Sequence, residues 1–116
     1  MKKILLVFVA GMFLLTGCET VSPALYSWYD SEDATYQYTK RTTDQTLANA
    51  MAQYEMVVKN QKAARKVVPP GINAEYGYLL CKSGRQEEGL TLLREEMRLY
   101  PESEKFISRI VKQLEK

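Results

Sequence analysis

Apolar residues in the middle of the chain recur at helical spacing, which predicts a first helix that begins at Thr43 or Asp44. Its apolar face consists of Leu47, Ala50, Met51, Tyr54, Val57 and Val58. Either residue at the start carries a short side-chain oxygen that accepts from the free amides of the first turn. Basic residues gather near the expected C-terminal end, where the helix dipole favours cations: Lys59, Lys62, Arg65 and Lys66. We interpret this basic run as a solvated face rather than a binding patch.

A second helix is predicted after Pro69-Pro70-Gly71, because tandem prolines disfavour helix before and within them. It runs from about Asn73 to Lys82 and ends in a turn at Ser83-Gly84. The residues expected on one stripe of it are Ala74, Gly77, Tyr78 and Cys81. The short turn predicts a hairpin with the helix that follows.

Two further helices complete the pattern, a third from about Gln86 to Tyr100 and a fourth that Ser103 is expected to cap. The third helix buries Leu90, Leu93, Met97 and Tyr100. The fourth carries a strong apolar stripe of Phe106, Ile107, Ile110, Val111 and Leu114. Residues 25–40 are rich in aromatic residues without a clean period, and we expect a loop or short helix there. No strand pattern competes, so the predicted fold is all-α, with one small helical domain over residues 25–116.

The chain begins with Lys2 and Lys3, an apolar stretch and a small-residue exit, which is the layout of a secretory signal peptide. The apolar stretch is shorter than the roughly 20 residues of a membrane span. Leu15-Thr16-Gly17-Cys18 resembles the lipobox of bacterial lipoproteins. The resemblance implies a signal peptide over residues 1–17, recognised by its peptidase through Leu15, Thr16 and Gly17. It also implies that Cys18 receives diacylglycerol on its thiol and an acyl chain such as palmitate on its amine.

Residues 18–24 then form a lipidated cysteine and a short linker. Glu19 follows the cysteine, whereas an Asp there favours retention at the inner membrane. For a Gram-negative source, the resemblance therefore implies the inner leaflet of the outer membrane, facing the periplasm. Cleavage removes Lys2 and Lys3 and leaves 14 of the 16 basic residues against 14 acidic ones. A neutral domain gives no reason to propose a nucleic acid as partner.

The remaining chemistry argues against an enzyme. The chain has no histidine, which removes His-based triads, His metal sites and the usual general base. Lipidation of Cys18 leaves Cys81 without an intrachain partner, and we favour its burial over pairing between chains. The carboxylates of Glu87-Glu88 and Glu95-Glu96 are expected on solvated helix positions rather than in a cleft. We therefore expect no catalytic activity, no metal, no cofactor and no small-molecule substrate.

The second and third helices together resemble a tetratricopeptide repeat, which has about 34 residues. With Pro101 as the terminal proline, Gly77 and Gly89 take the close-packing positions, Gly84 the turn, and Leu93 the large apolar position. Asn73 and Glu96 depart from the pattern, since an aromatic residue and an alanine are usual there. One repeat cannot bury both of its faces, so the first helix is expected to cover one side and the fourth to cap the other.

The repeat resemblance also implies where a partner binds, because the first helix of each repeat lines the concave groove. It places Ala74, Tyr78, Cys81 and Lys82 there. The alternative is that Tyr78 and Cys81 are core residues, and the pattern leaves both interpretations open. Trp28 and Tyr29 are the other candidates, since aromatic residues are common anchors at interfaces, although core packing is favoured for them.

The mature chain as a whole resembles a family of small proteobacterial lipoproteins known as a domain of unknown function. The resemblance rests on three segments, Leu25-Tyr26-Ser27-Trp28-Tyr29, Pro69-Pro70-Gly71-Ile72-Asn73-Ala74-Glu75-Tyr76-Gly77-Tyr78 and Tyr100-Pro101-Glu102-Ser103 with Phe106. It implies genomic company with a lipoprotein like the curli secretion channel. We therefore expect a non-catalytic accessory lipoprotein that docks a protein partner in an envelope complex. The alternative is a lipoprotein that binds peptidoglycan or regulates wall synthesis, with Trp28 and Tyr29 stacking on sugar rings.

Overall fold

The computed structural model of the chain describes residues 1–3 and 22–116. Within these residues the fold is all-helical and contains no strand, which confirms the predicted class. The helices are α2 (Ser31–Lys40), α3 (Asp44–Lys59), α4 (Ile72–Lys82), α5 (Gln86–Leu99) and α6 (Glu104–Leu114), with a short 3₁₀-helix η1 (Pro101–Ser103) before α6. The predicted signal-peptide cleavage site, Leu15 to Gly17, and the lipidation site Cys18 lie outside the described residues.

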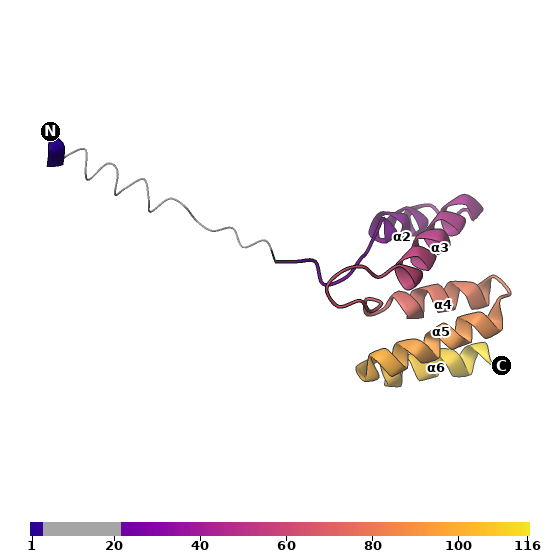
Figure 1. The fold of residues 1–116 in the computed structure, drawn as a ribbon. Coiled ribbons are helices and arrows are strands. Elements are labelled where there is room, and N and C mark those ends of the chain that lie inside the picture. The colour runs from indigo at the N-terminus through magenta and orange to yellow at the C-terminus, as the bar shows by residue number, and fades with distance from the viewer. Residues whose placement is uncertain (4–21) are drawn as a thin grey trace.

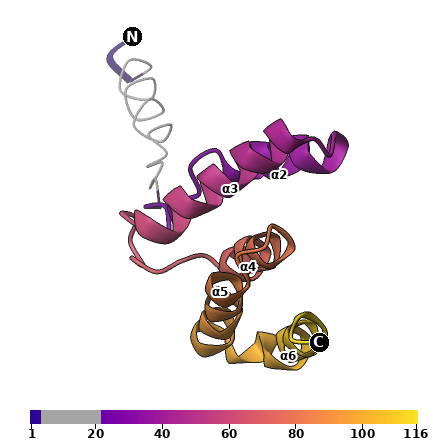
Figure 2. The same ribbon diagram turned by 90° about the vertical axis from the view of Figure 1, so that its right-hand side faces the viewer.

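Each helix packs against the next one along the chain, and the pair α4 and α5 has the most extensive contact. Figure 1 shows α2 beside α3, α4 beside α5, and α6 at the far end of the stack. Figure 2 shows from a second side that α4 separates the α2–α3 pair from α5 and α6. The central helix α4 therefore has to bury side chains on two of its faces.

Helix α3 begins as the sequence predicts but ends earlier than the basic run implies. The side chain of Thr43 accepts from the backbone N–H of Thr46, and the side chain of Thr46 accepts from the backbone N–H of Thr43 in return. This capping box satisfies amides of the first turn. At the other end the helix stops at Lys59, so the prediction that Lys62, Arg65 and Lys66 extend its C-terminal end is wrong.

The basic residues instead lie in the connecting loop, residues 60–71, which pairs with the N-terminal arm, residues 24–29. The side chain of Gln61 accepts from Ser27 N–H at 3.0 Å and donates to the Ser27 carbonyl at 2.8 Å. The backbone amides of Ala64 and Arg65 donate to carbonyl groups of the arm, each at 3.1 Å. These long-range contacts end α3, because they take over polar groups that a longer helix would satisfy internally.

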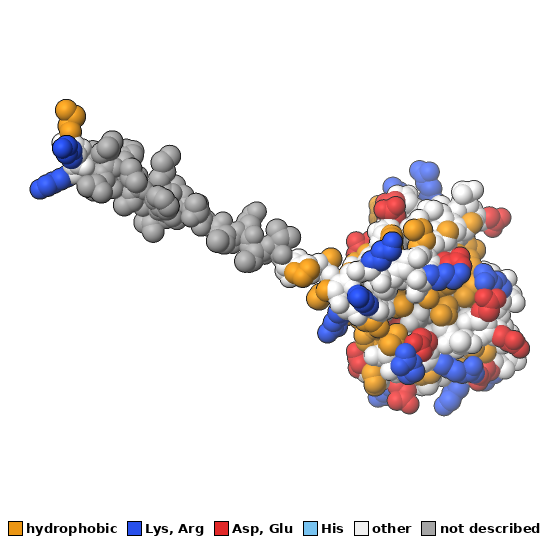
Figure 3. Space-filling view, in the orientation of Figure 1, with side chains coloured by type: hydrophobic (Ala, Val, Ile, Leu, Met, Phe, Trp, Pro, Cys, Tyr) orange, Lys and Arg blue, Asp and Glu red, His pale blue; other side chains and the backbone are white. Residues whose placement is uncertain are grey.

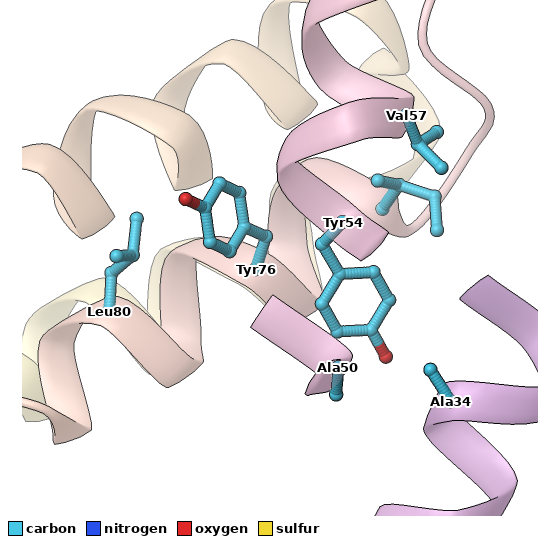
Figure 4. Packing of buried hydrophobic residues seen from close by; sticks show 7 residues of the cluster. Ala34, Ala50, Tyr54, Val57, Tyr76 and Leu80 are labelled. Carbon is cyan, nitrogen blue, oxygen red and sulfur yellow. The ribbon is translucent and has the colours of Figure 1, made fainter. Parts of the chain in front are cut away.

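Helix α4 packs toward α3 through one face. The buried members of this α3–α4 core are Ala34, Ala50, Tyr54, Val57, Ile72, Tyr76 and Leu80, and Figure 4 shows Tyr54 and Tyr76 between the helices. Of the predicted stripe, Ala74, Gly77 and Cys81 pack toward α5, but Tyr78 is 43% exposed. The face toward α3 instead contains Tyr76 and Leu80, which the predicted stripe did not include. Burial of a side chain such as Leu80 contributes about 1.5–3 kcal/mol.

The other face of α4 packs on α5 at a close approach of two glycines. A Cβ atom added to Gly77 would lie 2.6 Å from the carbonyl oxygen of Gly89, and one added to Gly89 would meet the backbone of Gly77 and Cys81. This is the close contact that the sequence predicts for the pair. Any side chain at either position would push the two helices apart, since the obstacle is backbone.

Helices α5 and α6 close the stack with a second core. Its buried members are Leu90, Leu93, Ile107 and Val111, and α6 buries this side of its stripe as predicted. Phe106 was expected in the same stripe but is 68% exposed, because it lies one position before the buried Ile107. Ser103 stands at the N-cap position of α6 without capping it, since its hydroxyl donates to the Tyr100 carbonyl instead.

Candidate functional site

A groove of about 310 Å³ lies between α2, α3 and α4. Seven residues line it, Thr35, Tyr38, Thr39, Tyr54, Glu75, Tyr78 and Leu79. Helix α2 contributes two threonines and an aromatic ring, α3 a second ring, and α4 a carboxylate with a third ring. The groove therefore combines apolar surface with hydrogen-bonding groups, which is typical of a recognition site.

Tyr54 holds the floor of this groove in place. Its hydroxyl donates to Oε2 of Glu75 at 2.5 Å and lies 2.6 Å from Oγ1 of Thr35, so one side chain connects all three helices. Burial, together with the hydrogen bond to Glu75, raises the pKa of Tyr54. The phenol therefore stays protonated and keeps donating, and it is a fixed structural donor rather than a general base.

Glu75 is the only charged side chain among the described residues that line the groove. It follows that a ligand with a positive charge is favoured there over an anion. The exposed Tyr78 and the partly buried Tyr38 line the same space, and the faces of aromatic rings attract cations. The arrangement can bind a cationic or hydroxyl-bearing group, and it contains no nucleophile with an activating base.

Of the residues that the sequence analysis proposed for a groove, the structure places Tyr78 in it. Ala74 and Cys81 do not line the groove, because both pack against the α5–α6 core. Lys82 is exposed in the last turn of α4 and does not line the groove. Trp28 and Tyr29 are exposed in the N-terminal arm, so the favoured core role is wrong for both.

Cys81 is partly buried and is a free cysteine. Its sulfur lies 3.5 Å from the Gln86 carbonyl, to which the thiol donates. Burial raises the pKa of the Cys81 thiol, so the reactive thiolate is disfavoured. This environment matches a packing role in the hairpin rather than a nucleophilic one.

Glu96 contradicts the expectation that all four paired carboxylates are solvated. Glu88 and Glu95 form surface ion pairs with Arg85 and Arg98, at 2.6 and 2.5 Å. Glu96 is only 2% exposed, because it lies one helical turn after the buried Leu93 on the inner face of α5. Its Oε1 accepts from the backbone N–H of Gly71 at 2.6 Å.

This carboxylate caps α4 from a neighbouring helix. Gly71 is the N-cap residue of α4 and has no side chain to offer, so α5 supplies the acceptor. Burial raises the pKa of Glu96, and the amides of Gly71, Ala74 and Asn73 oppose that rise. The balance leaves the pKa above its ordinary value. Sequence reasoning missed this role, because the contact joins residues 25 positions apart.

The groove itself was also only partly predicted. Thr35 and Tyr38 were not proposed as site residues, because the segment before α3 has no helical period from which a face can be read. Glu75 of α4 was not proposed either, since it lies outside the stripe that the sequence predicts for that helix. Among the described residues, no group of three or more His, Cys, Asp or Glu is placed to hold a metal ion. No helix in the part of the chain that the structure describes is long and apolar enough to cross a membrane.

Comparison with protein families gives one match, to the domain of unknown function DUF4810, over residues 25–110. The chain belongs to this family. The match begins at the N-terminal arm and ends within α6, so the DUF4810 domain contains the groove, the connecting loop and the Glu96 cap. Searches of curated proteins and of solved structures give no match.

Proposed function

We propose that the protein is a non-catalytic lipoprotein that docks a protein partner through the groove between α2 and α4. Lipid on Cys18 anchors it to the outer membrane, where the domain faces the periplasm. The observation that carries the proposal is the groove, which Tyr38, Tyr78 and a single carboxylate, that of Glu75, line together. The absence of histidine from the sequence and the raised pKa of the Cys81 thiol favour binding over catalysis.

The domain is, in this proposal, tetratricopeptide-like. The contact of Gly77 with Gly89 and the turn at Gly84, where φ is +89°, support that interpretation. In such a repeat, α2 and α4 are the first helices of two successive hairpins, and first helices line the concave side. The groove lies between these two helices, which is where the resemblance implies that a partner binds.

The partner segment is proposed to present a lysine or arginine to the groove. Glu75 supplies the negative charge, and its carboxylate has an oxygen, Oε1, beyond the one that Tyr54 occupies. Tyrosine rings with exposed faces favour the apolar stem and the charge of such a side chain. A lipoprotein resembling the curli secretion channel is one candidate partner to examine for an accessible basic segment.

The test is a crosslinked pull-down from membranes with the lipidated chain. Tyr78→Ala removes an anchor ring, whereas Tyr36→Ala removes a ring that is 58% exposed on α2 outside the groove. We expect Tyr78→Ala and Glu75→Gln to lower partner recovery about ten-fold or more, and Tyr36→Ala to leave it unchanged. Equal recovery with all three variants contradicts docking at this groove.

Sedimentation with isolated cell-wall sacculi separates this proposal from the peptidoglycan alternative. A protein-docking module stays in the supernatant, with or without Trp28. Sedimentation that depends on Trp28 and Tyr29, with Tyr78 dispensable, favours wall binding instead. The two exposed rings of the arm make that outcome a real competitor, because exposed aromatic faces also stack on sugars.

A further inference from the structure

The N-terminal arm and the connecting loop form an exposed aromatic and basic surface. The arm exposes Leu25, Trp28 and Tyr29, and the loop exposes Lys62, Arg65 and Lys66. Neither segment contains an acidic residue; Asp30 follows the arm directly, Glu55 and Glu75 flank the loop along the chain, and Glu95 lines a pocket with Lys66. The groove does not include any of these residues, so this surface is a separate feature.

Hydrogen bonds hold the surface in one shape. The Ser27 hydroxyl accepts from the backbone amides of Lys62 and Ala63, each at 3.1 Å. The Tyr29 hydroxyl donates to the Asn60 carbonyl at 2.5 Å. These bonds fix the arm on the loop, so the backbone of both segments loses little conformational entropy when the surface binds.

Aromatic and basic side chains meet directly within this surface. The guanidinium of Arg65 lies 5.7 Å from the centre of the Tyr26 ring and donates to its hydroxyl at 2.7 Å. The Tyr26 ring in turn meets Trp28 edge to face, with ring centres 6.1 Å apart. Tryptophan and tyrosine rings prefer the boundary between water and lipid, and lysine and arginine side chains are attracted by anionic headgroups.

The surface lies close to the lipid anchor, which favours a membrane as its binding partner. Leu25 follows Cys18 by seven residues, which can span at most about 25 Å. Figures 1 and 2 both show the connecting loop beside the point where the chain enters the domain. Figure 3 shows hydrophobic and basic side chains at that junction. A lipid on Cys18 therefore keeps this surface within one short tether of the bilayer.

We infer that the arm and the connecting loop dock on the phospholipid surface of the membrane that carries the anchor. Trp28 and Tyr29 enter the headgroup boundary, and Lys62 and Lys66 face anionic phosphates. The inference rests on the lipid anchor of the proposed function, but not on the groove. Docking fixes the orientation of the domain, because the domain then contacts the bilayer through this surface as well as through the lipid on Cys18.

Trp28 is the single tryptophan of the chain, so its fluorescence reports on this surface alone. The experiment uses the full chain, lipidated in cells and reconstituted in vesicles of phosphatidylethanolamine with a minor fraction of phosphatidylglycerol. Lipids brominated on the upper acyl chain quench a tryptophan at the boundary, and aqueous iodide quenches an exposed one. We expect strong quenching by the brominated lipid and protection from iodide.

Charge variants test the role of the loop. Lys62→Gln with Lys66→Gln removes two positive charges from the surface, and is expected to lower the ratio of docked to undocked protein about 25-fold. Lys105→Gln with Lys112→Gln makes the same charge change on α6 and serves as the matched control. Added salt is expected to reproduce the loss in the unmodified chain, because it screens the attraction.

The possible outcomes are distinct. In one of them, the protein floats with the vesicles while iodide quenches Trp28 and the brominated lipid does not. That result overturns the docking and favours a protein partner for the surface. Equal loss in both double variants overturns the assignment to the loop lysines. Failure of the chain to float with vesicles overturns the anchor, and the docking with it, but leaves the groove untouched.

Discussion

The buried carboxylate of Glu96 makes the stability of the fold depend on pH in a direction that is unusual for a glutamate. Burial raises its pKa above the ordinary value of 4.5. Between that value and the higher pKa of the folded state, the folded protein binds more protons than the unfolded one. The free energy of unfolding therefore decreases as pH rises through this window, by about 1.4 kcal/mol for each unit of pKa shift.

Glu96→Gln removes this dependence with little change of shape. The amide oxygen still accepts from the Gly71 N–H, now as a neutral hydrogen bond that is weaker by about 1 kcal/mol than one to a charge. At about pH 4, where Glu96 is protonated in both states, we expect the variant to equal the parent within about 1 kcal/mol. Toward about pH 7 we expect the variant to become more stable than the parent, because only the parent buries a charge there.

The assay is urea unfolding followed by circular dichroism in a mild detergent, across this pH range. Glu95→Gln is the control on the adjacent residue, where Arg98 lowers the pKa of the exposed carboxylate. Its contribution to stability is present above the ordinary pKa and is lost as pH falls, so the control trends the opposite way. A Glu96→Gln variant that becomes less stable than the parent as pH rises would refute the reasoning. It would show that the amides of α4 lower the pKa of Glu96 by more than burial raises it.

Three further substitutions test the packing, each by the same unfolding measurement. Tyr54→Phe is expected to cost about 1–2 kcal/mol, since it leaves Glu75 and Thr35 without the shared hydroxyl, and an unchanged stability would mean that water replaces that hydroxyl. Gly77→Ala is expected to cost about 1–2 kcal/mol, because the clash with the Gly89 carbonyl exceeds the gain in helix propensity, and stabilisation would contradict the close approach. Thr43→Ala is expected to cost about 1 kcal/mol through loss of the capping box, whereas Thr43→Ser should retain most of the stability.

The sequence predicts the parts of this fold that depend on local signals. The start of α3 at its Thr43 cap, the break at Pro69-Pro70-Gly71 and the turn at Gly84 all follow from residues next to one another in the chain. The approach of Gly77 to Gly89 was also predictable, because a repeat pattern spaces the two glycines. Local chemistry was enough in each of these cases.

What the sequence does not predict depends on contacts between distant residues. The end of α3 at Lys59 is determined by the pairing of Gln61 with Ser27, a contact that no helical period reveals. The side of α4 that faces α3 was not predicted, for a related reason. A helix buried on two faces has no single apolar stripe. In α4, Tyr76 and Leu80 are buried on one face and Gly77 on another, so the sequence pattern does not show which face meets α3.

Of the two departures from the repeat pattern that the chain resembles, Glu96 has a physical explanation. A glycine at the start of α4 suits the left-handed backbone after the tandem prolines, with φ of +92° at Gly71, but it cannot cap the helix. An alanine at position 96 would leave those amides without their carboxylate. Asn73 is also buried, but its side-chain nitrogen and oxygen have no hydrogen-bond partner among the described residues, so the cap does not explain that departure. The Glu96 cap implies that Glu96→Ala should cost more than an ordinary surface change, about 2–4 kcal/mol, through a lost hydrogen bond and a cavity.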